Sequence, residues 1–83
     1  LAVVHYNLAS AEEALGDWAL ALAHYGETVQ GAPESGSTLR VDALLGQARM
    51  FRRLHRIEEG RAALERAQRE ATTLGNPAAL APV

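Results

Sequence analysis

The sequence contains no cysteine and no lysine, and its 83 residues include three prolines and a single tryptophan. Without cysteine, the chain has no disulfide framework, no thiol nucleophile and no cysteine-ligated metal site. No apolar run approaches the roughly 18–20 residues that a membrane-spanning helix needs. The net charge of -2 argues against a general binder of nucleic acid or of membrane surfaces. A small soluble domain is therefore expected.

Alanine and leucine are abundant instead: 17 Ala and 12 Leu account for 29 of the 83 residues. This composition favours a mostly helical protein. A chain of this length has room for one domain at most, so we expect a single domain over 1–83. Because the sequence begins with Leu1 rather than Met, we expect a piece of a longer protein or a processed product.

Charge is distributed unevenly along the chain. Residues 1–38 carry five acidic side chains and no arginine, for a net charge of -5, whereas residues 39–83 carry eight arginines and five acids, for +3. This asymmetry is compatible with end-to-end stacking or with a charged partner. It is equally compatible with helix faces that are simply solvated.

Apolar residues recur at helical spacing, and no segment alternates strongly enough for a strand. The pattern predicts helices over about 2–15, 17–30, 38–54 and 57–74, with a loop at 31–38. The connections within each helix pair are very short, which makes the paired helices antiparallel. Asp17 is expected to cap the second helix with its carboxylate, after Gly16 ends the first. The expected fold is all-α, with two helical hairpins.

Each predicted helix has a stripe of residues expected to face the core. In the first helix the stripe is Val4, Leu8, Ala11 and Leu15; in the second it is Trp18, Ala21, Leu22, Tyr25 and Val29. In the third it is Val41, Leu44, Leu45, Ala48, Phe51 and Leu54; in the fourth it is Ile57, Gly60, Leu64, Ala67, Ala71 and Leu74. The fourth stripe repeats most regularly, at steps of three and four residues.

No arrangement of polar residues predicts catalysis, a metal site or a cofactor. His5, His24 and His55 share no helical spacing, so each is expected to pack between helices or to lie on the surface. The adjacent acids Glu12 and Glu13 point about 100° apart on a helix, and we expect both to be solvated. We therefore expect no enzyme activity.

A shift of 39 residues aligns the two hairpins, with large residues on large ones and small on small. Trp18 falls on Ile57, and Tyr25 falls on Leu64. Such self-similarity indicates a helical repeat protein. The segment Leu-Gly-Asp-Trp-Ala-Leu-Ala at 15–21 closely resembles the Gly-Asp-Tyr-x-x-Ala turn of tetratricopeptide repeats. The positions typical of that family are held here by His5, Leu8, Ala9, Glu12, Ala21, Tyr25, Thr28 and Pro33.

The resemblance implies antiparallel hairpins stacked as an α-solenoid. Repeat one would span about 2–35 and repeat two about 38–75, and a third helix pair would start at 77–83. The 39-residue period exceeds the family's usual 34 or so. Longer repeats that end in segments like Arg-Glu-Ala-Thr-Thr-Leu-Gly-Asn-Pro at 69–77 resemble those of large bacterial transcriptional regulators. The implied role is a cytoplasmic protein-interaction module that senses or assembles.

In this family the first helices of successive repeats line a concave groove that binds a protein or peptide. The groove positions map to Tyr6, Asn7, Ser10 and Glu13 in repeat one and to Leu45, Arg49, Arg52 and Arg53 in repeat two. The three arginines would form a cationic cluster for carboxylates, or they are simply solvated. Reversing all three to Glu is expected to abolish partner binding and to leave helicity intact.

The expected partner is a protein or peptide, with no direct contact to nucleic acid or membrane. Because two repeats leave apolar surface uncovered, a homo-oligomer through the open end is also expected. The alternative is a purely structural oligomerisation element. That alternative is a dimerising bundle, in which the fourth helix would close onto the first.

Overall fold

The computed structural model describes residues 2–32 and 38–73, and these residues form helices and no strand. The helices are α1 (Ala2–Leu15), α2 (Trp18–Gly31), α3 (Thr38–Arg53) and α4 (Ile57–Thr73). The all-α prediction is confirmed, and every helix begins and ends within one residue of its predicted bounds. The predicted loop residues 33–37 and the predicted third helix pair at 77–83 lie outside the described residues.

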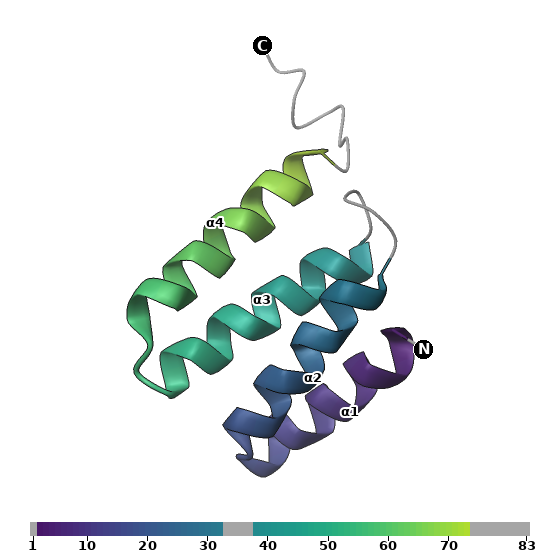
Figure 1. The fold of residues 1–83 in the computed structure, drawn as a ribbon, viewed down its shortest axis with the longest axis vertical. Helices are drawn as coiled ribbons and strands as arrows, with labels where there is room; N and C mark the ends of the chain where they lie inside the picture. Colours follow the sequence, from purple (N-terminus) through teal and green to yellow (C-terminus); the bar gives the residue numbers. More distant parts are fainter. Residues whose placement is uncertain (1, 33–37, 74–83) are drawn as a thin grey trace.

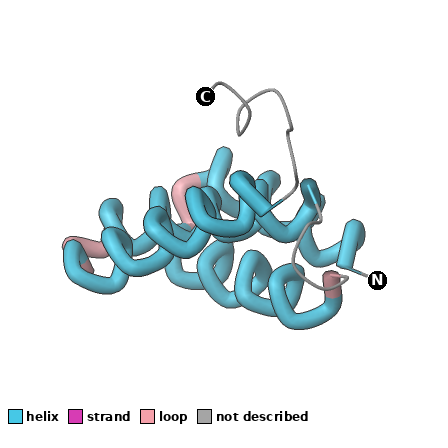
Figure 2. The backbone as a smooth tube through the Cα atoms, turned by 90° about the horizontal axis from the view of Figure 1, so that it is seen from above, coloured by secondary structure: helices cyan, strands magenta, loops and turns pink. Residues whose placement is uncertain are grey.

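The helices are arranged in chain order. Helix α1 packs on α2, α2 on α3 and α3 on α4, and a smaller contact joins α1 to α3. Figure 1 shows α1 and α4 at opposite edges of the molecule. Figure 2 shows that the described part of the chain is helical apart from short connections. No described helix combines the length and apolar character needed to cross a bilayer.

The turn between α1 and α2 closes with a left-handed residue at Gly16, whose φ is 85°. The N–H of Gly16 donates to the carbonyl of Glu13 at 3.1 Å, and the N–H of Asp17 donates to that of Glu12 at 2.9 Å. This pair of bonds is a Schellman motif. Asp17 is the N-cap of α2, but its carboxylate makes no capping bond, contrary to the prediction. Its backbone ψ of 75° lies outside the extended conformation usual for N-caps.

The turn between α3 and α4 repeats this geometry 39 residues later. The N–H of His55 donates to Arg52 at 3.0 Å, and that of Arg56 donates to Phe51 at 2.7 Å. His55 occupies the left-handed position with a φ of 64°. A β-carbon is disfavoured in this conformation, so His55 bears strain that glycine avoids at the equivalent place in the first hairpin.

The core lies between the helices and is built from small residues around a few large ones. Its fully buried members include Tyr25, Leu44 and Met50, with alanines from each of the four helices. The stripes predicted for α2 and α3 are confirmed, since all their members are buried or half-buried. Gly46 allows the closest approach, because a β-carbon there would lie 2.6 Å from the Tyr25 ring. The ring therefore requires glycine on α3 at that point.

The core-facing stripe predicted for α1 is wrong. Val4, Leu8 and Leu15 are exposed, the last to 83%. The helix instead turns Ala9 inward, together with half-buried polar side chains on the same side. The polar groups on that side bind residues of α2 and α3. The spacing of apolar residues does not reveal such contacts.

The stripe predicted for α4 is partly wrong. Gly60 and Ala67 are buried as expected, but Ile57 and Leu64 are 52% and 42% exposed. Ala71 is also exposed, and Leu74 lies outside the described residues. The buried face of α4 consists of Gly60, Ala63, Ala67 and Glu70. This face is rotated from the predicted one, since it consists of small residues and of Glu70, which binds Arg40 of α3.

Candidate interaction surface

The predicted groove residues of α1 and α3 are brought together by an ion pair. The Arg49 guanidinium donates from Nε to Glu13 Oε2 at 2.8 Å and from Nη2 to Oε1 at 3.0 Å. The pair joins the two hairpins across the contact between α1 and α3. Of the remaining predicted residues, Tyr6 and Leu45 are half-buried, and Asn7, Ser10, Arg52 and Arg53 are exposed. We call the surface formed by these eight residues the α1–α3 face.

Tyr25 of α2 adds a hydrogen bond to this ion pair. Its hydroxyl donates to Glu13 Oε1 at 2.7 Å, and its ring meets Tyr6 edge-on with centroids 5.7 Å apart. The hydrogen bonds from Arg49 hold the pKa of Glu13 below its ordinary value. Burial, followed by the bond to Glu13, raises the pKa of Tyr25. This network keeps the Glu13 carboxylate charged and occupied.

The three arginines of the predicted cluster have different environments. Arg53 lies over the Trp18 ring with its guanidinium carbon 4.8 Å from the centroid, a cation–π contact between hairpins. Arg49 is bound by Glu13. Arg52 forms no ion pair or ring contact within the described part of the chain. The three side chains line a cavity of about 370 Å³, in which neither Arg52 nor Arg53 has a carboxylate partner among the described residues, and Arg52 lacks a ring contact as well.

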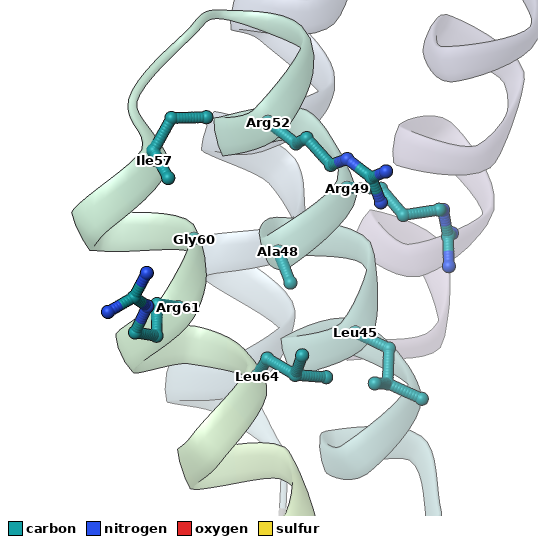
Figure 3. A pocket seen from close by; sticks show the side chains of 8 residues that line it. All are labelled: Leu45, Ala48, Arg49, Arg52, Ile57, Gly60, Arg61 and Leu64. Carbon is teal, nitrogen blue, oxygen red and sulfur yellow. The ribbon is translucent and has the colours of Figure 1, made fainter.

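A second groove, of about 410 Å³, lies between α3 and α4 (Figure 3). Its apolar lining comes from Leu45, Ala48, Ile57, Gly60 and Leu64, and its arginines are Arg49, Arg52 and Arg61. The sequence analysis missed this groove because it assigned Ile57 and Leu64 to the core. Gly60 keeps the two helices close, since a β-carbon there would approach Phe51 Cβ to 3.3 Å. We call this feature the α3–α4 groove.

Polar side chains of the first hairpin pack α1 against α2. His24 Nδ1 lies 2.6 Å from Glu12 Oε1, and the His5 and His24 rings stack with centroids 5.6 Å apart. The prediction that these histidines pack between helices is confirmed. The prediction of solvated acids is wrong for Glu12 and Glu13, although the two carboxylates do diverge. One binds α2 and the other binds α3.

Arg40 and Glu70 form a buried ion pair that the sequence analysis did not anticipate. Arg40 Nε donates to Glu70 Oε1, and its Nη1 donates to the carbonyl of Val29, both at 2.7 Å. Arg66 adds a bond to Glu70 at 3.3 Å. Burial raises the pKa of Glu70, but the bonds from Arg40 and Arg66 more than offset this, so its pKa is lowered. A carboxylate three residues after buried Ala67 was the available signal.

Over residues 2–32 and 38–73, no group of three or more His, Cys, Asp or Glu side chains could hold a metal ion. The chain matches no family model, and no curated protein or solved structure is significantly similar to it. Function is therefore inferred from the two surfaces described above.

Proposed function

We propose that this protein is an interaction module of the tetratricopeptide kind, which binds an acidic peptide on the α1–α3 face. The observation that carries the proposal is Arg52, an exposed guanidinium without a carboxylate partner among the described residues, in a cavity it shares with Arg49 and Arg53. A guanidinium presents a planar fork that matches a carboxylate through two hydrogen bonds. Arg49 is bound by Glu13, and Arg53, which lies over the Trp18 ring, is a second guanidinium without a carboxylate partner among the described residues.

Three features of the fold support a solenoid over a closed bundle. The helices pack in chain order, α3 contacts both helices of the first hairpin, and α1 and α4 lie at opposite edges (Figure 1). A dimerising bundle would instead bring α4 onto α1. The two hairpin turns also share one Schellman geometry at a spacing of 39 residues. These features fit successive hairpins added in the same orientation.

The ligand proposed here is an extended segment with several carboxylates. Asn7 and Ser10 are exposed on α1, and their side chains can form hydrogen bonds with a peptide backbone. The 39-residue period and the resemblance of 69–77 to segments of bacterial transcriptional regulators support a role in sensing or assembly within such a regulator. In that role the module would contact protein, not DNA.

Fluorescence anisotropy with a labelled peptide of alternating Glu and Pro tests the proposal. Proline prevents helix formation, so the probe reports on an extended ligand. Arg52→Glu should weaken binding at least tenfold, whereas Arg69→Glu, at an exposed position on α4, should weaken it much less. The same peptide with Gln in place of Glu should not bind. If both variants lose the same binding affinity, the effect comes from net charge alone, and the site is refuted.

A further inference from the structure

We propose that the α3–α4 groove binds an acidic amphipathic α-helix, seated on the second hairpin as α3 is seated on the first. The groove shares Leu45, Arg49 and Arg52 with the α1–α3 face, but its lining on α4 is its own, and the inference does not depend on peptide binding on that face. Figure 3 shows Ile57 and Leu64 on α4 flanking the groove, with Leu45 and Ala48 opposite on α3.

The 39-residue repeat identifies what the groove is shaped to hold. Its residues align with the part of the first hairpin that packs against α3. The aligned pairs are Leu45 with Tyr6, Gly60 with Ala21, Ile57 with Trp18, Leu64 with Tyr25 and Arg52 with Glu13. In the first hairpin Tyr25 is 1% exposed, and α3 approaches its ring closely at Gly46. Its counterpart Leu64 is 42% exposed.

The contacts of α3 define the register that an occupant would adopt. A β-carbon on Gly46 would touch the Tyr25 ring, Arg49 binds Glu13, and Arg53 lies over Trp18. These three α3 residues follow the i, i+3, i+7 spacing of one helix face. A helix in the same register on the second hairpin would place a small residue over Leu64. Its next two contacts would face Arg52 and Ile57.

The charge of the groove is opposite to that of the first hairpin. Where the first hairpin offers the carboxylate of Glu13 to a basic helix, the second offers the guanidinium of Arg52. Arg61 lines the same groove, and neither arginine forms an ion pair with a described carboxylate. The matching helix therefore carries a carboxylate where α3 carries Arg49. Over Ile57 it carries an apolar residue where α3 carries Arg53.

A second copy of this chain fits the groove less well. Outside the groove itself, the apolar side chains it exposes include Val4, Leu8 and Leu15 on one face of α1. Two copies that face each other through Ile57 and Leu64 would bring the groove arginines of both copies together. The carboxylates on α1 are bound within the same copy, Glu12 by His24 and Glu13 by Arg49. Docking α1 into the α3–α4 groove would leave the groove arginines without a free helical carboxylate. The charge pattern thus favours a separate acidic helix.

The test uses two helical probes derived from α3. The first is the amidated, labelled peptide 38–54 with Arg53→Leu, and the second carries Arg49→Glu as well. Anisotropy titrations with the full 83-residue chain should show at least tenfold tighter binding of the doubly substituted peptide. Because Arg49→Glu would also repel Glu13, this peptide cannot displace native α3 from the first hairpin.

Variants of the chain locate the binding. Arg52→Glu should reverse the preference between the two peptides, an outcome that loss of folding cannot produce. Leu64→Glu should weaken the doubly substituted peptide at least tenfold. Leu20→Glu is the matched control, since Leu20 is 45% exposed on α2 and should matter little. Both proposals use Arg52, so the uncharged variant Leu64→Ala separates them: it should weaken the doubly substituted peptide and leave binding of the Glu-Pro peptide unchanged.

Equal affinity for the two peptides, or a preference that Arg52→Glu leaves unchanged, would overturn the proposal. So would equal effects of Leu64→Glu and Leu20→Glu. Sedimentation equilibrium of the chain alone tests whether a second copy occupies the groove. Self-association that Leu64→Glu abolishes and Leu20→Glu does not would place a second copy in the groove instead.

Discussion

Arg49 on α3 and Glu13 on α1 form a two-bond ion pair that joins the hairpins, with N–O distances of 2.8 and 3.0 Å. The same arginine belongs to the cluster that the sequence predicts for ligand binding. Its guanidinium is therefore already occupied, and the cluster divides into two structural residues, Arg49 and Arg53, and one free residue, Arg52. This division changes which substitutions report on binding and which report on stability.

We expect Arg49→Glu to lower the free energy of unfolding by about 1–3 kcal/mol, because it removes charge-assisted bonds and opposes two carboxylates. Urea denaturation followed by circular dichroism measures this change. Arg52→Glu, with no partner to lose, should stay within about 0.5 kcal/mol of the parent. Reversing all three arginines together is therefore expected to lower stability as well as to affect binding. Similar stabilities for the two variants would show that the ion pair contributes nothing.

Gly46→Ala and Gly26→Ala should change stability in opposite directions. At Gly46 the new β-carbon would lie 2.6 Å from the Tyr25 ring, and forced repacking costs about 1–3 kcal/mol. At Gly26 the nearest neighbour is the amide nitrogen of Gln47 at 3.4 Å, on a side chain that can shift. Alanine there should gain up to about 1 kcal/mol of helix propensity. Thermal unfolding of both variants measures these changes in stability. If Gly46→Ala stabilised the protein, the close approach of α3 to the Tyr25 ring would be refuted.

His55→Gly should stabilise the second hairpin by about 1 kcal/mol, since it relieves the left-handed conformation at φ 64°. Gly16→Ala at the equivalent turn, where φ is 85°, should destabilise by a similar amount. Chemical denaturation of the pair measures both effects against one parent. If glycine at 55 destabilises, the imidazole must contribute more at this turn than the strain costs.

Stability should decrease as the pH falls into the acid range. The folded-state pKa values of Glu13 and Glu70 lie below the ordinary value of 4.5, so the unfolded chain binds protons first. The stabilisation is fully present above about pH 5 and is lost as the pH falls through the lowered values. Denaturation midpoints at several pH values would show this slope. Glu70→Gln should flatten it, and Glu58→Gln, at an exposed position, should not.

The helices and their ends follow from local signals in the sequence. Gly16 supplied a left-handed residue at a helix end, and the apolar spacing of α2 and α3 identified their buried faces. The spacing failed for α1 and α4, where an equally regular apolar face was available on the exposed side. Ala9, which lies off the predicted stripe of α1, could be placed inside only once the polar partners of its neighbours were known. Periodicity shows where apolar residues recur along one helix, but it carries no information about which helix packs against that face.

The candidate site, too, was predictable from the sequence only in part. The 39-residue repeat placed Glu13 and Arg49 on equivalent first helices, and the resemblance to tetratricopeptide repeats predicted that they share one face. Only the tertiary structure showed that the two side chains bind each other and that Arg52 remains free. The position of Glu70 on the buried side of α4 could be read from the sequence, but its pairing with Arg40 could not, because the two residues are 30 positions apart on different helices.

The sequence by itself determined that this chain is all-helical, where its helices begin and end, and that its two hairpins repeat. These properties depend on backbone conformation and on residue spacing within about one turn, which are local. The tertiary structure decided which helix faces are covered, which charges are paired and where the α3–α4 groove opens. Those outcomes depend on how side chains of different helices meet, and the spacing along one helix does not encode that.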